Sequence, residues 1–222
     1  MGKISEIFSS VQGEGLYCGR RQIFVRFFGC NLSCKFCDTR LNNFEGFSPY
    51  RLLAELKKYP EDFHSISFTG GEPLLQKEFL GEVLKLTKER GIVNYLETNG
   101  TLPDALDEVI DLVDIVAMDL KLPSSTGLVS FWKEHRRFLK IASRKEVFLK
   151  AVICKSTTGD DIREAIKLIK GTNKDAVLVL QPNTEEYDAQ LKNKIEKCRK
   201  ACVDAHIKVK VIPQMHKLLG VK

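Results

Sequence analysis

Three cysteines stand close together in the segment Gly29-Cys30-Asn31-Leu32-Ser33-Cys34-Lys35-Phe36-Cys37-Asp38-Thr39, at Cys-x3-Cys-x2-Cys spacing. The segment follows an apolar run (Ile23 to Phe28) that is typical of a buried strand. One short loop with this spacing can turn all three sulfurs toward a common point. A zinc site here would need a fourth protein ligand, whereas a [4Fe–4S] cluster held by three thiolates leaves one iron open for a small molecule. Because three of the seven cysteines fall within eight residues, a metal or cluster site is favoured over unrelated buried thiols.

A second motif, Gly70-Gly71-Glu72-Pro73, follows a predicted strand (Ser65 to Thr69) and precedes a predicted helix. Most Gly-Gly pairs are flexible turns, but glycines also let the backbone approach a ligand closely. With both motifs, the chain resembles the radical S-adenosylmethionine superfamily. The resemblance implies that the open iron binds the amino and carboxylate groups of S-adenosylmethionine. It also implies that residues 70–73 contact the methionine part of this cofactor.

The composition is that of an ordinary globular chain, with 43% apolar and 29% charged residues. Its 222 residues suffice for one domain and are too few for two of ordinary size, so we expect a single domain over residues 1–222. We expect no signal peptide and no membrane helix, since no apolar run is long enough. The number of cysteines is odd and three of the seven lie in one loop, which does not indicate a disulfide framework, so we expect a cytoplasmic protein.

The net charge of +6 is modest, and basic and acidic residues are interleaved along the chain. Helix surfaces such as Lys192 to Lys200 are typical of solvated faces. We therefore expect neither a nucleic-acid partner nor a membrane partner, while an anionic small substrate would suit a slightly basic protein.

After an opening hairpin (strands at 3–8 and 22–28), the pattern alternates between helix and strand. Ser48 as N-cap and Pro49 predict the first helix, and Gly91 and Gly171 are expected to end later helices. Helices are predicted at 75–90, 103–112, 131–142, 160–170 and 185–205, with strands at 65–69, 93–97, 115–119, 147–153, 176–180 and 207–212. Such alternation implies parallel strands with helices outside. We predict an α/β fold, an incomplete (β/α)6 parallel-strand barrel with an N-terminal antiparallel hairpin.

In such folds the site is formed by polar residues just past the carboxyl ends of the strands. Every candidate motif follows a predicted strand, so all should lie on one rim: 30–39, 69–73, 97–100, 119–125, 150–155, 181–183 and 213–216. This agreement favours an enzyme over a structural module.

Several rim motifs allow two interpretations. Glu97-Thr98-Asn99-Gly100 is either an Asn-Gly turn or a source of ribose contacts. Asp119 to Ser125 is either a capped loop or supplies lysine and serine hydrogen bonds to the cofactor, and Gln181-Pro182-Asn183 either contacts adenine or begins the last helix. The remaining cysteines (Cys18, Cys154, Cys198 and Cys202) are interpreted as structural. Of the four histidines, His64, His135 and His206 are interpreted as ordinary structural residues, and only His216, on the rim, is a candidate for a functional role.

Further motifs narrow the resemblance: Gln12-Gly13-Glu14-Gly15, Arg26-Phe27, Gly70 to Gln76, Glu97 to Thr101 and Pro213 to Lys217. With them, the chain resembles the 7-carboxy-7-deazaguanine synthases over nearly its whole length. The resemblance implies a lyase of queuosine and deazapurine biosynthesis. This lyase converts 6-carboxy-5,6,7,8-tetrahydropterin to 7-carboxy-7-deazaguanine with release of ammonia, using a 5′-deoxyadenosyl radical and Mg2+. It further implies a flavodoxin- or ferredoxin-type reductant and a homodimer.

The resemblance also assigns residues by position, with no catalytic residue beyond the cluster and cofactor. Cys30, Cys34 and Cys37 would hold the [4Fe–4S] cluster, and Thr39 would bind Mg2+. Substrate contacts are expected from Gln12, Gly13, Glu14, Arg26, Thr69, Pro213 and Gln214. Contacts to S-adenosylmethionine are expected from Phe36, Cys37, Asp38, Gly71, Glu72, Asn99, Lys121, Ser124, Ser125 and Gln181.

Two other functions share part of the pattern. A glycyl-radical activating enzyme has the same cysteine spacing and Gly-Gly-Glu-Pro motif but acts on a protein. A protein substrate needs no enclosed site for a carboxylate. Arg26 and the turn at 12–15 would form such a site, so they argue against this function. A zinc-binding interaction domain would be colourless, with a fourth ligand near the cysteine loop.

Overall fold

The computed structural model describes residues 1–39, 42–215, 217 and 220, and their strands form one sheet in the order β3-β1-β2-β4-β5-β6-β7-β8-β9. From β2 to β9 all neighbours are parallel, whereas β1 is antiparallel to β2 and β3. The strands are β1 Gly2–Val11, β2 Arg21–Phe27, β3 Glu45–Phe47, β4 Ser65–Gly70, β5 Asn94–Thr98, β6 Ile115–Asp119, β7 Glu146–Ile153, β8 Val177–Pro182 and β9 Val209–Val211. The predicted incomplete barrel with an N-terminal hairpin is confirmed.

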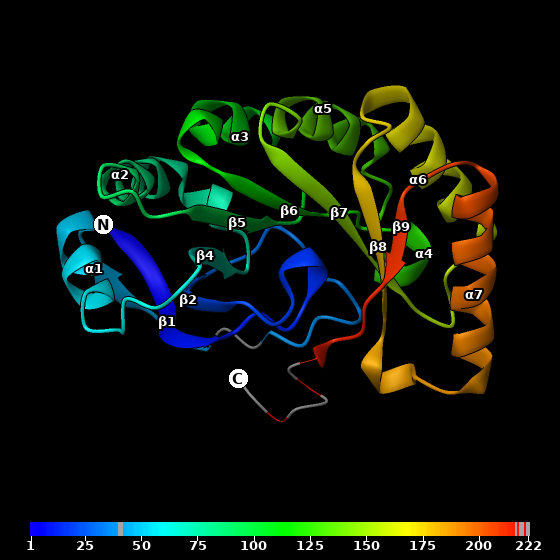
Figure 1. Ribbon diagram of the computed structural model, residues 1–222, viewed down its shortest axis with the longest axis horizontal. Coiled ribbons are helices and arrows are strands. Elements are labelled where there is room, and N and C mark those ends of the chain that lie inside the picture. The colour runs from blue at the N-terminus through cyan, green and yellow to red at the C-terminus, as the bar shows by residue number, and fades with distance from the viewer. Residues whose placement is uncertain (40–41, 216, 218–219, 221–222) are drawn as a thin grey trace.

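The helices cover the convex side of this curved sheet and leave its other side open (Figure 1). They are α1 Pro49–Leu56, α2 Lys77–Lys88, α3 Pro103–Val109, α4 Pro123–Thr126, α5 Trp132–Ala142, α6 Gly159–Thr172 and α7 Ala189–Asp204. Four 3-10 turns add η1 Gly15–Tyr17, η2 Pro73–Gln76, η3 Ile110–Leu112 and η4 Thr184–Glu186. Among the described residues, we find no helix with the length and apolar character needed to cross a membrane.

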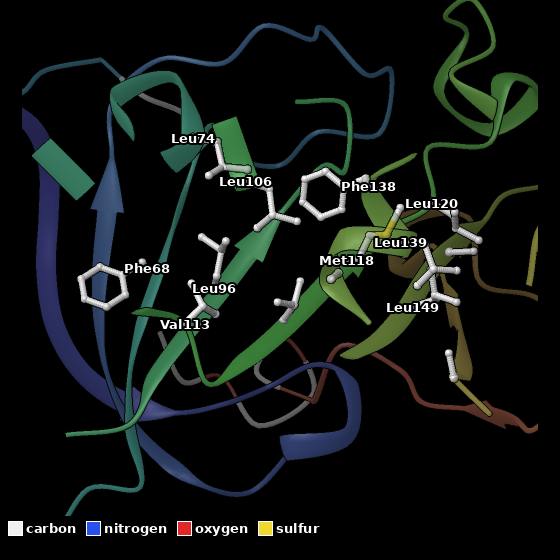
Figure 2. Close-up of a cluster of buried hydrophobic side chains, with 14 of the residues drawn as sticks. Phe68, Leu74, Leu96, Leu106, Val113, Met118, Leu120, Phe138, Leu139 and Leu149 are labelled. Atoms are coloured by element: carbon white, nitrogen blue, oxygen red, sulfur yellow. The ribbon is translucent and has the colours of Figure 1, made fainter. Parts of the chain in front are cut away.

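Alternation along the strands sends one set of side chains to the helices and the other into the barrel. The outward set, exemplified by Phe68, Leu96 and Leu149, is fully buried against the helices (Figure 2). On β2, Val25 and Phe27 belong to this core, so the intervening Arg26 faces inward, as predicted. Cys198 and Cys202 of α7 are buried in the same core, in agreement with a structural role.

Inside the barrel, a smaller apolar cluster closes the end opposite the carboxyl ends of the strands. Tyr95, Phe148 and their neighbours pack against Tyr17 of η1, whose ring lies 5.6 Å from that of Tyr95. The Tyr17 hydroxyl donates to Glu146 at 2.6 Å. Gly15 approaches this cluster with φ +65°, and a Cβ there would lie 2.6 Å from the Phe148 ring. The glycine therefore allows close packing with the barrel floor rather than with a ligand.

The predicted cap of the first helix is confirmed, whereas the bounds of several other helices differ from expectation. The Ser48 hydroxyl accepts from Arg51 N at 3.2 Å, which confirms the predicted cap. Gly171 does not end its helix but lies within α6, which continues to Thr172. Phe131 precedes α5 and is only partly buried, while Phe138 and Ala142 are in the core. The expected long last helix begins only at Ala189, after η4 and the Asp188 cap. The short elements β3 and α4 were not predicted, because three or four residues carry no periodicity.

We expect Gly15→Ala to lower the free energy of unfolding by about 2–5 kcal/mol. A left-handed backbone with a Cβ costs roughly 1–2 kcal/mol, and overpacking against Phe148 adds roughly 1–3 kcal/mol. Gly19→Ala is the matched control, since Gly19 also has positive φ but a Cβ there would meet nothing within 4 Å. Anaerobic urea unfolding of both variants gives the difference. Equal losses would show that the approach to Phe148 is not tight.

Candidate active site

A cavity of about 580 Å3 opens at the carboxyl ends of the strands, above the apolar barrel floor. It brings together most of the residues that the sequence assigned to a site. These are Gln12, Gly13, Glu14, Arg26, Cys30, Cys34, Phe36, Cys37, Asp38, Thr39, Thr69, Gly71, Asn99, Lys121, Gln181 and Gln214. The predicted rim therefore exists as one continuous surface, built from segments up to 200 residues apart.

The three cysteines of the loop all line this cavity, two of them exposed and Cys34 partly buried. The loop is held by Lys35 N donating to Thr126 O at 3.0 Å and by Asn31 Nδ2 donating to Thr101 Oγ1 at 2.9 Å. Burial raises the pKa of the Cys30 and Cys34 thiols. Three thiols facing one cavity are the donor set of a cluster with an open iron, and they lose their protons on binding metal. Among the described residues, no three His, Cys, Asp or Glu side chains form a compact site for a single metal ion.

Gly70 and Gly71 lie directly against the start of the cysteine loop. Gly71 N donates to Phe27 O at 3.1 Å and Glu72 N donates to Gly29 O at 2.8 Å. A Cβ on Gly71 would lie only 1.9 Å from Gly29 O, so no other residue fits. The glycines thus serve the contact between two backbones, one of which leads into Cys30.

Glu72 does not line the cavity but is completely buried behind it. Its carboxylate accepts hydrogen bonds from Leu74 N (3.1 Å), Thr98 Oγ1 (2.9 Å) and Asn99 N (2.7 Å). Burial raises its pKa to about 7, although these hydrogen bonds act in the opposite direction. The Glu72 side chain fixes the loop after β5, so a cofactor contact from this motif is left to the backbone.

Asn99 extends from that loop toward the cysteines. Its Nδ2 donates to Asn31 Oδ1 at 2.8 Å and lies 4.0 Å from Cys30 Sγ. Behind it, His135 is buried with Nε2 3.2 Å from Asn99 O, and its Nδ1 has no partner among the described residues. The alternative of an Asn-Gly turn is also present, since Gly100 has φ +71°. The turn at Asn99-Gly100 is therefore confirmed, and a ribose contact from this loop stays a prediction.

A chain of alternating charges crosses the inner wall. Lys150 on β7 bridges Glu14 and Asp119, with Nζ 3.3 Å from Asp119 Oδ1, and Lys121 Nζ lies 2.5 Å from Asp119 Oδ2. Burial alone would raise the pKa of Asp119, but the charges of both lysines hold it below its usual value. Burial would likewise lower the pKa of Lys150, yet the two carboxylates raise it well above its usual value. Asp119, Lys121 and Lys150 are therefore ionised at neutral pH.

Glu97 lies in the middle of the inner wall and is held by neutral donors. It accepts from Gln12 Nε2 (2.9 Å), Ser67 Oγ (2.8 Å) and Thr69 Oγ1 (3.3 Å). Among the described residues, no lysine or arginine nitrogen lies within 4.0 Å of its carboxylate. Gln12 and Thr69, both predicted substrate residues, are thus oriented by this carboxylate.

Arg26 lines the cavity, but it is neither fully enclosed nor unpaired. Its Nε donates to Glu6 Oε2 at 3.2 Å, its guanidinium lies 5.7 Å from the Phe8 ring, and its side chain is 23% exposed. Phe8 stacks on Phe24 at 5.0 Å, which gives this side of the cavity an aromatic surface. The sequence predicts a carboxylate-binding site around Arg26 alone. In the structure, this arginine is held in place by the Glu6 carboxylate and the Phe8 ring.

Gln181 is the second-last residue of β8, and its buried side chain lines the cavity. Its Oε1 has no hydrogen-bond partner among the described residues. Buried polar atoms are rarely left unpaired, so a ligand in the cavity would supply the missing donor. This suits the predicted contact with adenine, whose exocyclic amine is a donor.

Four predicted residues do not line the cavity: Pro213, Glu72, Ser124 and Ser125. Ser124 bonds to Asp161 of α6, its N donating at 2.9 Å, and Ser125 Oγ lies 2.7 Å from Thr157 Oγ1. These bonds hold α4 against α6 and the segment before it, and the predicted hydrogen bonds of these serines to the cofactor stay a prediction. His216 lies outside the described residues.

Several lining residues were not among the site residues assigned from the sequence: Glu6, Phe8, Phe24, Glu97, Asp119, Lys150, Asn183 and Lys217. Four of them, Glu97, Asp119, Lys150 and Asn183, were on predicted rim segments. Phe24 shares a strand face with Arg26, a spacing that could have identified it. Glu6 and Phe8 could be assigned to the site only from the register of β1 with β2, which pairs Glu6 with Arg26 and Phe8 with Phe24.

Comparison with known proteins agrees with this geometry. Residues 24–187 match the Radical SAM superfamily. Two crystal structures have the same fold: QueE from Escherichia coli (TM-score 0.65, 20% identity, covering 95% of this chain and 93% of that one), and a domain of pyruvate-formate lyase-activating enzyme from Bacteroides vulgatus (0.55, 19%, 66% and 98%). The fold and the site therefore define a radical S-adenosylmethionine protein.

Closer relatives specify the family. The 7-carboxy-7-deazaguanine synthase of Geobacter sulfurreducens is 38% identical over 244 residues, covering 98% of this chain and 97% of the relative. That of Methanothermobacter thermautotrophicus is 34% identical over 245 residues, covering 99% and 97%. The chain belongs to the 7-carboxy-7-deazaguanine synthase family.

The buried His135 predicts a pH dependence of stability. Burial lowers its pKa from 6.5 to about 4, so between these values the unfolded state binds a proton that the folded state does not. Stability should then fall as the pH drops from 6.5 to 4, by about 3 kcal/mol for this group. In urea unfolding at pH 6.5 and pH 4.5, His135→Gln should lose less stability than the parent. Equal losses in both proteins would show that His135 takes up its proton while folded.

Proposed function

We propose that this protein converts 6-carboxy-5,6,7,8-tetrahydropterin to 7-carboxy-7-deazaguanine with release of ammonia. The observation that supports this most is the common cavity, which joins the three loop thiols to Arg26 and to the turn Gln12–Glu14. Membership of the family points the same way, since its members carry this activity in their name. The two alternatives from the sequence, a protein-activating enzyme and a zinc interaction domain, give no reason for a charged, enclosed cavity.

The chain's own residues would divide the cavity between two molecules. When bound, a [4Fe–4S] cluster on Cys30, Cys34 and Cys37 supplies the electron that cleaves S-adenosylmethionine to methionine and a 5′-deoxyadenosyl radical. Asn99, Lys121 and Gln181 would orient the cofactor from the cluster side. Phe36 lies 5.7 Å from Lys121 Nζ and would pack with it there.

The opposite side of the cavity would hold the pterin. The Arg26 guanidinium, with Nε already on Glu6, has its terminal nitrogens as donors for the substrate carboxylate. Phe8 and Phe24 would offer a flat apolar surface to the ring system. Lys150 and Glu14 would orient polar ring atoms, and the apolar floor below them excludes water from that side. Thr39, which lines the cavity beside Cys37, would contribute a hydroxyl to Mg2+.

Three further assignments accompany the proposal. A flavodoxin- or ferredoxin-type protein would reduce the cluster, and the active form would be a homodimer. The protein would act in the cytoplasm, where its thiols stay reduced.

The direct test is anaerobic incubation with the carboxy-tetrahydropterin, S-adenosylmethionine, a reductant and Mg2+. We expect 7-carboxy-7-deazaguanine and ammonia in equal amounts, a brown protein with iron and sulfide in near-equal amounts, and slower turnover without Mg2+. Cys30→Ala should remove both the iron and the product, whereas Cys198→Ala, in the helical core, should keep both. A colourless protein holding one zinc would contradict the proposal.

Arg26→Lys should weaken pterin binding at least tenfold, because a lysine cannot replace the planar fork of donors. This corresponds to about 1.4 kcal/mol. Cleavage of S-adenosylmethionine without product should continue, since the cysteine loop is unchanged. Arg21→Lys on the same strand is the matched control, because Arg21 pairs with Asp62 at the surface. If pterin affinity stays within twofold of the parent, Arg26 does not bind the carboxylate.

A further inference from the structure

The segment after β9 leaves the sheet and runs back toward the N-terminal strands (Figure 1). We call its described residues, 213–215 and 217, the tail. Met215 N donates to Gly13 O at 2.8 Å, so the tail is bonded to the backbone of the turn Gln12–Glu14. The tail thus lies across the side of the cavity where the barrel is open.

Gln214 joins three segments through one buried amide. Its Nε2 donates to Glu14 Oε1 at 2.8 Å and to Asp38 Oδ2 at 3.4 Å, and its Oε1 accepts from Thr184 Oγ1 at 2.8 Å. The side chain is 9% exposed. The carboxylates of Glu14 and Asp38 accept hydrogen bonds and therefore face the amide nitrogen of Gln214, while the Thr184 hydroxyl donates to its amide oxygen. These partners fix the orientation of the amide group. With both N–H donors in use, Gln214 cannot donate to a substrate without breaking a bond to one of these carboxylates.

Lys217 completes the arrangement on the side of the cysteine loop. Its Nζ lies 2.6 Å from Asp38 Oδ2, the same oxygen that Gln214 approaches. Asp38 follows Cys37 directly and precedes Thr39. Without the lysine, the Gln214 amide would lie between two carboxylates with one fewer cation to offset their repulsion.

From these contacts we infer that Gln214 and Lys217 are positioning residues, which fix residues 37–39 of the cysteine loop relative to the turn Gln12–Glu14. This rests on the proposed function, in which the loop carries the radical source and the turn holds the pterin. The distance between radical and substrate is then set by the tail, although no tail residue takes part in the chemistry. Gln214, predicted as a substrate contact, is reassigned to this role.

Gln214→Glu is the sharpest test, because it keeps the volume and places a third carboxylate against Glu14 and Asp38. We expect amide hydrogen exchange in residues 34–39 and 12–14 to become at least tenfold faster in the iron-loaded protein. Iron release to a chelator should accelerate by a similar factor. The yield of product per 5′-deoxyadenosine should fall at least fivefold. Gln190→Glu, the same change at an exposed position of α7, is the control and should match the parent in all three measurements.

Lys217→Met tests the ion pair separately, with Lys208→Met as control because Lys208 forms a surface pair with Asp175 at 2.9 Å. We expect three- to tenfold faster exchange in residues 34–39, with restoration by Lys217→Arg. Exchange and iron release are measured without pterin, so they test the inference even if no deazaguanine product is formed. Unchanged exchange of residues 34–39 in both tail variants would overturn it, as would an equal increase in the controls. A loss of product with unchanged exchange would instead make Gln214 a substrate contact.

Discussion

Where β2 and β4 end, two backbones approach so closely that no side chain fits between them. Gly71 lies against Gly29, and the hydrogen bonds from Gly71 and Glu72 to Phe27 and Gly29 continue the parallel pairing of the two strands beyond the sheet. This contact fixes where the cysteine loop leaves the barrel. The loop that carries Asn99 is placed relative to the same point, because Glu72 in turn holds it. The Gly-Gly-Glu motif therefore has mainly a structural role, and only its two glycines also line the cavity.

The inner wall keeps charges where a folded core would favour apolar groups. Lys150, Asp119, Lys121 and Glu14 form a continuous chain of ion pairs. Removing such groups from water is costly, and a buried ion pair often adds no net stability. Breaking one pair is nevertheless destabilising, since it leaves a charge without compensation. The chain of charges therefore fixes the relative positions of β6, β7 and the turn at 12–14 more than it stabilises the fold.

The barrel interior changes character along its axis. Near the amino ends of the strands, Tyr95, Phe148 and Tyr17 fill the space and exclude water. Toward the carboxyl ends, the same strands present charged and amide side chains to the cavity. Because the interior is closed near the amino ends of the strands and open at their carboxyl ends, a small substrate can enter only from the carboxyl ends. Radical chemistry benefits from this arrangement, because an enclosed site limits side reactions of a reactive intermediate.

The sequence by itself determined the strand–helix alternation, the antiparallel start, the spacing of the thiols and the rim on which the site lies. These follow from local rules: periodicity, helix caps such as Ser48, and the polar residues that end each parallel strand. The contacts made by the side chains of Glu72, Ser124, Ser125 and Gln214 were decided only by tertiary structure. A polar side chain after a strand can face a ligand or a neighbouring helix, and the choice depends on partners such as Asp161, Thr157 and Glu14, far away along the chain. Glu6 and Phe8 became part of the site through strand register, which no short segment specifies, because register is set by pairing between chain segments.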